Sequence, residues 1–531
     1  MIALYPEFFN DVFGPIMQPG SSSHMAGPCR AGILCNSLLN EEVSDIRIEL
    51  DKDGSIAGTL GTMDEDTGML NGAIGNPVDH PDFFEIKAIL KKRNISYNID
   101  ICSMKESVHS NAMKFIIKGI SGKTVSIVAN STGGGMVETV WVNGYKFSGF
   151  GDTYVLFVTA PESAAVENEL TKKIHAVHEV LETGIGIGQN GGTVYWFKMP
   201  EKPDDGALSF LKKENYSVMK PVLPVISNKN RQPQLFNTMT QWRAIAKERN
   251  KSLFDVAVDY ETAASGWPRE RVIDYMRNRI QKTMHRRIYA IASGTEAPAP
   301  NAFFPASYKN WGNKMKDAKL VQGLFAKSIY YVSCARVQCP GVFDVPGPMG
   351  SGGGFISGIL HAVKEEFNLS DEDILRGLFI AAGIGAICYT RTNPTGEVIG
   401  CAGECGCCCA MAAAAVVEML HGTPQQIESA ASLALQNAVG WPCDIIPGGQ
   451  GMPCGSRILS VAVMSLVFAQ WALIDEDPVL PFHEVVDAAD RVGRSMDSGM
   501  LCTGRGGMCS VPTAQKTIEN FKKSELVPKL G

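Results

Sequence analysis

The pattern of apolar and polar positions separates a mixed first part of this 531-residue chain from a helical second part. Near the start, Ile46 to Leu50 alternates with period two, which predicts a strand, and Phe83 to Lys92 has the spacing of a helix. Two further strands are predicted at Met113 to Ile117 and at Val125 to Val128, before a turn at Gly133 to Gly135. We therefore expect an α/β-type sandwich domain in residues 1–150.

A smaller unit of the same kind follows in residues 151–228. The segments TYVLFV and TVYWFKM have strand patterns, a helical pattern between them runs to Val180, and ALSFLKKE after them has a second helical pattern. This order predicts a small βαβ-type module, with an ACT-like fold as one option.

The remaining residues, 229–531, show a different pattern. From about Phe236 to Phe521, apolar residues recur with helical spacing, and glycine-rich connections separate them without a convincing strand. We therefore predict an α+β protein whose last domain is all-helical. The longest apolar stretch, Ile458 to Ile474, is interrupted by three polar residues and followed by Asp475, which indicates a buried helix and not a membrane span.

Composition and charge indicate which partners and which cellular compartment to expect for this protein. A formal net charge of −6 and a pI near 5.9 give no reason to expect nucleic-acid or membrane-surface binding. The fifteen cysteines would form a disulfide framework only in an oxidising compartment, and the start MIALYPEFFNDVF lacks the features of a signal peptide. We therefore expect a cytoplasmic protein with reduced thiols.

Three cysteines have the surroundings of metal ligands. Cys401, Cys443 and Cys454 lie in IGCAGECG, GWPCDIIPG and GMPCGSRI, each with a glycine within three residues and with little charge nearby. Thiolates are the usual ligands of iron–sulfur clusters, and three of them would leave one iron of a four-iron cluster open as a Lewis acid. Spacings of 42 and 11 residues fit none of the short ferredoxin runs, so electron transfer is not the expected chemistry.

Each candidate also has a simpler interpretation. Scattered cysteines are more often buried core residues than metal ligands. This interpretation fits better for the four cysteines that precede a helix at Ala410 to Leu420, namely Cys405, Cys407, Cys408 and Cys409. One of these four could nevertheless replace a ligand. His24, after three serines, could be a structural residue of its turn. The glycine run 350–354 could be a flexible loop or could place a helix N-terminus against an anion. Arg457 could bind a substrate carboxylate, an anionic cluster or a neighbouring acid.

Several longer strings carry a family resemblance. The strings GEVIGCAGECG, PCDIIPGGQGMPC and CTGRGGMC resemble the α part of the iron–sulfur-dependent L-serine dehydratases. The strings PGSSSHMAGPCRAG, HSNAMKF and NSTGGGM resemble the β part of the same enzymes. Together the matches run from about residue 8 to 515, and residues 153–225 are not covered.

The resemblance implies a set of site residues. It makes Cys401, Cys443 and Cys454 the ligands of a [4Fe–4S] cluster and makes His24, Ser23 and His109 the candidates for catalysis. The substrate-binding candidates are Ser21, Ser22, Asn111, Ser131, Gly350, Ser351, Gly352 and Arg457. Some members place a cysteine at the extreme C-terminus in the site, but this chain ends ELVPKLG, so capping by such a tail is not expected.

Two strings depart from the family. Residues 62–66 are Thr-Met-Asp-Glu-Asp where the family has Gly-His-Gly-Thr-Asp, so a histidine often assigned an acid–base role is missing. Residues 346–354 replace a Thr-Ala-Pro-Thr-Asn-Gly run, so a substrate-holding threonine and asparagine are missing. Both changes remove polar groups and leave Met63 and Met349, so we expect serine to be a poor substrate or to share the site with a bulkier or less polar one.

The expected function is a cluster-dependent lyase that removes water from L-serine, or a β-substituent from a close relative, to give a 2-oxo acid and ammonia. Two alternatives remain. One is the same architecture acting on L-threonine, on L-cysteine with loss of sulfide, or on a hydroxy acid without an amino group. The other is a redox or iron sensor that uses an exposed cluster. The expected partner is a small amino-acid or hydroxy-acid substrate, with no nucleic acid or membrane, and the expected assembly is a homodimer.

Overall fold

The computed structural model describes residues 5–160, 163–296, 307–337, 339–345, 353–449 and 451–524. The chain folds into two compact units and passes from one to the other more than once. The first unit contains Met1–Ser22, Gly61–Met63 and Gln232–Val527, and the second contains Ser23–Leu60, Asp64–Arg231 and Pro528–Gly531. The division into three domains expected from the sequence stays a prediction.

A six-stranded sheet forms the centre of the second unit. Its strands are β1 (Val43–Asp51), β2 (Ser96–Cys102), β3 (Ala112–Gly119), β4 (Thr124–Gly133), β5 (Met136–Val142) and β6 (Tyr145–Gly149), in the order β2-β1-β3-β4-β5-β6. The β1 and β2 strands run parallel, with Ile48 opposite Ile99, and every other neighbouring pair is antiparallel. The strands predicted from alternating apolar residues are therefore confirmed as β1, β3 and β4.

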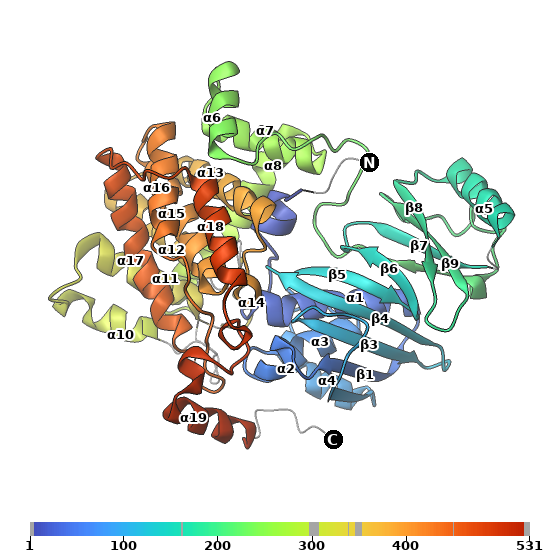
Figure 1. The fold of residues 1–531 in the computed structure, drawn as a ribbon. Helices are drawn as coiled ribbons and strands as arrows, with labels where there is room; N and C mark the ends of the chain where they lie inside the picture. Colours follow the sequence, from blue (N-terminus) through green and yellow to red (C-terminus); the bar gives the residue numbers. More distant parts are fainter. Residues whose placement is uncertain are drawn as a thin grey trace. The chain divides into compact units, whose positions relative to one another are not determined.

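Two closely packed helices, α1 (Gly27–Leu39) and α3 (Glu65–Ala73), lie beside this sheet (Figure 1). Glycines allow their backbones to approach: a β-carbon on Gly72 would lie 2.0 Å from the Cys29 carbonyl oxygen, and one on Gly68 would lie 2.2 Å from that of Met25. The same unit contains α2 (Ser55–Thr59) and, at the predicted position, the helical turn η3 (Phe83–Glu85) followed by α4 (Ile86–Lys92).

A four-stranded antiparallel sheet follows in the same unit. It has the order β10-β7-β9-β8 and consists of β7 (Tyr154–Thr159), β8 (Glu182–Ile187), β9 (Thr193–Met199) and β10 (Tyr216–Met219). Helix α5 (Ala164–Val177) connects β7 to β8, and β9 lies between those two strands, so the predicted βαβ module is present in its split form.

The β7 strand contributes side chains to two hydrophobic cores, because its side chains alternate between the two faces of the sheet. Val155 and Phe157 belong to the core of the six-stranded sheet, where the Phe157 ring lies 5.0 Å from that of Phe147. Leu156 and Val158 belong to a second core that α5 helps to form. The four-stranded sheet is therefore packed into the second unit through shared apolar side chains.

The prediction of a helix at ALSFLKKE is wrong. Residues 206–211 form successive turns, with the Leu208 N–H donating to the Asp204 carbonyl at 3.1 Å, and only a short 3₁₀ turn follows at Lys213–Asn215. Leu208 is buried in the second core, but Ser209 and Phe210 beside it are exposed. The segment is short, and Leu208 is its one fully buried apolar side chain, so tertiary packing does not stabilise a first helical turn there.

The first unit is built from helices around α15 (Cys407–Met419). All of its residues are buried, as expected for a helix that is apolar on every side. Its neighbours are α12 (Gly353–Phe367), α13 (Asp371–Arg391), α16 (Pro424–Gln436) and α17 (Cys454–Leu473). The other helices are α6 (Met239–Glu248), α7 (Leu253–Ser265), α8 (Arg269–Tyr275), α9 (Lys282–Ala292), α10 (Ser307–Lys314), α11 (Gly323–Arg336), α14 (Gly396–Ile399), α18 (Phe482–Arg494) and α19 (Pro512–Lys522). Within the described part of residues 236–521, only isolated bridges interrupt this helical character, which confirms the predicted class.

The N-terminal segment belongs to the core of this helical unit. The π-helical turn η1 (Phe8–Val12) is buried, and the Phe8 ring stacks on Tyr260 of α7 with centroids 5.0 Å apart. The Phe8 N–H donates to Glu261 Oε2 at 2.6 Å. The first residues of the chain are therefore anchored to residues some 250 positions later.

In the described part of the chain, three helices are long and apolar enough to cross a bilayer. They are α13, the continuous helix Ala402–Met419, and α17, and 78%, 94% and 44% of their most apolar windows are buried inside the structure. The stretch predicted as a buried helix is thus α17, which buries one face and exposes Trp471 and Ser460 on the other.

Candidate functional site

The three cysteines predicted as ligands meet in the first unit. Cys443 and Cys454 both pack against a buried cluster of Met63, Ile445 and Cys502. Cys401 lies with them, because both it and Cys454 act electrostatically on Arg457 and on Cys405. Segments separated by 42 and 11 residues along the chain therefore bring three thiols to one place.

Two of the three thiols stand at helix N-termini. Cys401 directly precedes the helix Ala402–Met419, and Cys454 is the first residue of α17. The positive end of a helix dipole favours a thiolate and any anion bound by it. The Cys401 N–H donates to the Trp441 carbonyl at 2.8 Å, so this ligand is also fixed to the segment that leads to Cys443.

The third thiol, that of Cys443, lies on an extended segment that runs beside residues 500–502. The Cys443 N–H donates to the Met500 carbonyl at 2.8 Å, and the Cys502 N–H donates to the Cys443 carbonyl at 2.7 Å. Gly396 of α14 leaves room for the sulfur, since a β-carbon there would lie 2.7 Å from Cys443 Sγ. The backbone thus holds Cys443 and Cys502 next to one another.

The protein alone disfavours negative charge on Cys443 and on the nearby Cys405. A hydrogen bond with Cys502, followed by burial, raises the pKa of Cys443 well above its ordinary value. A hydrogen bond with Cys401, followed by burial, does the same for the pKa of Cys405. A bound cation would offset this cost by accepting the thiolates, so the donor set fits a thiolate-bound metal cluster.

Arg457, in the first turn of α17, supplies positive charge beside the thiols. Its Nη1 donates to Asp444 Oδ1 at 2.6 Å and to the Pro442 carbonyl at 2.8 Å. Burial lowers the pKa of Arg457, but Asp444 and then the Cys401 and Cys454 thiols raise it above its ordinary value. Of the interpretations considered from the sequence, the structure shows the ion pair with a neighbouring acid, Asp444.

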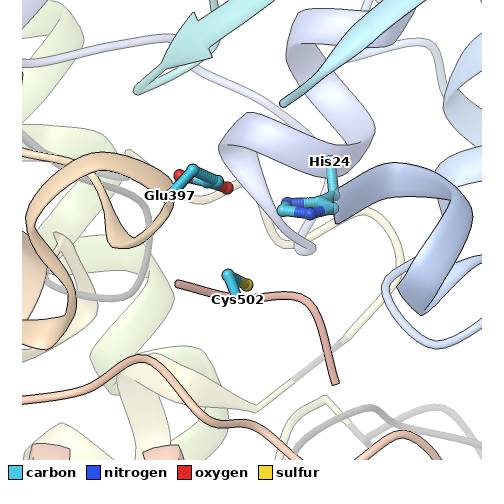
Figure 2. Close-up of side chains that lie close together, drawn as sticks. All are labelled: His24, Glu397 and Cys502. Atoms are coloured by element: carbon cyan, nitrogen blue, oxygen red, sulfur yellow. The ribbon is translucent and has the colours of Figure 1, made fainter. Parts of the chain in front are cut away.

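Sequence reasoning missed several residues at this place. Glu404 follows Cys401 by three positions, so helical spacing could have found it; Cys405, one position further, was considered only as a possible replacement ligand. Glu397 and Cys502 stand in the strings GEVIGCAGECG and CTGRGGMC, but no spacing links them to one another. Tertiary folding brings a Glu397 carboxylate oxygen and Cys502 Sγ within 4.8 Å (Figure 2). Met63, singled out as a departure, belongs to the buried cluster against which Cys443 and Cys454 pack.

His24, also drawn in Figure 2, belongs to the second unit and lies in the π-helical turn Ser22–Ala26 that leads into α1. Its ring is only 1% exposed and is held between two hydroxyls, with Nδ1 2.9 Å from Ser23 Oγ and Nε2 2.9 Å from Ser55 Oγ. A hydroxyl can donate or accept, so either neutral tautomer of the ring is satisfied. Ser55 was not predicted, since nothing in the sequence links it to residue 24.

The other candidate residues of the second unit differ in the hydrogen bonds that they make within the protein. Ser131 donates its hydroxyl to the Ser23 carbonyl at 2.6 Å, which positions the histidine turn. His109 Nδ1 accepts the Asn111 N–H at 3.0 Å within its own loop. The Asn111 side chain is 1% exposed, and no described residue hydrogen-bonds to its Oδ1, so this amide is better placed than Ser131 to bind a ligand.

The remaining candidates lie in the first unit or outside the described residues. Ser22 is fully buried, and among described residues its hydroxyl has no hydrogen-bond partner, whereas Ser21 is half-buried. Gly350, Ser351 and Gly352, like Met349, fall outside the described residues, and α12 begins directly after them at Gly353.

Comparison with known proteins places the helical part of the chain in one family. The family model described as "Serine dehydratase alpha chain" matches residues 213–509. The "L-serine dehydratase, alpha chain" of Peptoniphilus asaccharolyticus is 30% identical over 297 residues, which are 54% of this chain and 99% of that protein. The "Probable L-serine dehydratase, alpha chain" of Bacillus subtilis is 27% identical over 285 residues, 53% of this chain and 94% of that protein. An L-serine dehydratase of Escherichia coli is 29% identical over 184 residues, 34% of this chain and 40% of that protein.

Proposed function

Because this chain belongs to the serine dehydratase alpha-chain family, we propose that it is a [4Fe–4S]-dependent lyase that removes water from L-serine, or a β-substituent from a close relative, giving a 2-oxo acid and ammonia. The observation that carries the proposal is the meeting of Cys401, Cys443 and Cys454 within the part of the chain that the family model matches.

These three cysteines would hold the cluster. When bound, a cluster with three protein ligands supplies a Lewis-acidic iron for the β-hydroxyl group. The helix N-termini at Cys401 and Cys454 and the Arg457 guanidinium would balance its negative charge. Gly396 would let α14 pack closely beside Cys443, since a β-carbon there would lie 2.7 Å from the Cys443 sulfur.

His24 would take the α-proton of the substrate. A neutral imidazole with hydroxyls on both nitrogens can accept a proton on one side while the other side donates to Ser23 or Ser55. Asn111 would bind a polar end of the substrate through its buried amide, and Ser131 would keep the histidine turn in place.

The test is anaerobic reconstitution of the full chain with iron and sulfide, followed by measurement of bound iron and of 2-oxo acid released from L-serine. Cys401→Ser, Cys443→Ser and Cys454→Ser should each lose iron and activity. The buried Cys407 offers a matched control, because Cys407→Ser changes the same atom within α15 and should keep the iron. Unchanged iron content in all three ligand variants would sink the proposal.

A further inference from the structure

Cys502 is a fourth thiol at the place where the three predicted ligands meet. It is 5% exposed and forms the buried cluster with Met63 and Ile445 against which Cys443 and Cys454 pack. It comes from 59 residues beyond Cys443, so only tertiary structure brings it there. Cys405 is also close, but it follows Cys401 by four residues in one helical segment, and its proximity is a consequence of helix geometry.

The backbone at Cys502 is held in an unfavourable conformation. Its φ is +62°, in the left-handed region that glycine, asparagine and aspartate adopt most readily. Its N–H donates to the Cys443 carbonyl at 2.7 Å, and the adjacent Thr503 hydroxyl donates to the Gly499 carbonyl at 3.1 Å. A glycine would meet this backbone requirement more easily, so the thiol itself is a reason for a cysteine here.

We propose that Cys502 is an internal fourth ligand, whose thiolate binds the fourth iron of the cluster while the site holds no substrate. The inference rests on the proposed function, because it concerns the same cluster. Substrate binding would displace the thiolate by simple substitution: the iron–sulfur bond breaks, its electron pair returns to Cys502 Sγ, and a lone pair of the incoming ligand takes its place. The exchange needs no oxidant or reductant. It would protect the open iron between turnovers.

Mild oxidation tests the proposal without an activity assay. A four-iron cluster with four cysteine ligands resists loss of an iron, whereas a cluster with an open iron loses it to ferricyanide and shows the EPR signal of a three-iron cluster. In the anaerobically reconstituted full chain, wild type and Cys405→Ala should keep all their iron without substrate, and Cys502→Ala should lose about one iron per cluster. Adding L-serine or L-cysteine should make wild type behave like Cys502→Ala.

Equal iron loss from wild type and Cys502→Ala without substrate would overturn the inference and leave the proposed function intact. A wild-type protein that binds no cluster would overturn both. If Cys502→Ala does not assemble a cluster, Cys502→Ser decides: an iron bound through oxygen has a distinct Mössbauer doublet, and a spectrum of this serine variant identical to that of wild type would show that residue 502 is no ligand.

Discussion

At the scale of single residues, His24 is the side chain on which the proposed chemistry depends most. His24→Ala should lower kcat by about 10²–10⁴-fold, the usual contribution of a general base, because no other imidazole is hydrogen-bonded to Ser23 and Ser55 in the described structure. The cluster absorption spectrum should not change. His80→Ala, in a loop of the same unit, is the control. A fall in kcat of less than about tenfold would mean that His24 only supports its turn.

Substrate preference is the second property decided by single residues. Met63, at the position where the resemblance would put a histidine, contributes a soft, apolar thioether to the buried cluster against which Cys443 and Cys454 pack. We therefore expect L-serine to be no better than L-cysteine or L-threonine in kcat/KM under anaerobic conditions, since a site that lacks a polar partner loses discrimination. A preference for L-serine of about a hundredfold over every alternative would contradict this expectation.

The residues that the sequence could predict are those whose signal is local. Cys401, Cys443 and Cys454 stand in glycine-rich strings, and His24 follows a run of serines, so local composition together with the family resemblance made them candidates. Ser55 has ordinary neighbours in the sequence, and Glu397 and Cys502 were not singled out although they stand in two of the family-like strings. The importance of all three comes from what the fold places beside them. No periodicity could have linked residue 24 to residue 55.

At the scale of elements, close helix packing supports the turn that contains His24. Gly72→Ala should lower the stability of the second unit by about 1–3 kcal/mol, because the added methyl would lie 2.0 Å from the Cys29 carbonyl oxygen and force α1 and α3 apart. Thermal unfolding followed by circular dichroism measures the change. Gly206→Ala is the matched control, since its new methyl would come no closer than 3.5 Å to another residue. Equal melting temperatures for the two variants would contradict the prediction.

Elements were predictable where their composition was strongly biased. The β7 and β9 strands are rich in valine, tyrosine and phenylalanine, and both were predicted. The β8 strand contains two glycines and β10 has only four residues, so neither carries a clear strand pattern. The ALSFLKKE segment has helical spacing over too short a distance, and the fold uses it as turns.

At the scale of the whole molecule, the shared core of the two sheets predicts joint stability. Phe157→Ala should cost about 3–5 kcal/mol, because its ring leaves a cavity in the core of the six-stranded sheet although the residue belongs to β7. Hydrogen exchange should speed up in β3 and β4 as well as in β9. Ile185→Ala on the exposed face of β8 should leave all three unchanged. Faster exchange confined to the four-stranded sheet would mean that the two sheets unfold separately.

The N-terminal segment has a consequence for biosynthesis. Phe8 and the buried apolar residues Phe9, Val12 and Phe13 near it are synthesised well before Tyr260 and Phe379, the ring partners of Phe8, which are made some 250 to 370 residues later. At about 5–20 residues per second, these apolar side chains wait on the order of tens of seconds without their native neighbours. We therefore expect the nascent chain to depend on a chaperone that shields these residues. Expression at reduced temperature should also change the yield of this protein more than the yield of a chain whose N-terminal segment folds locally.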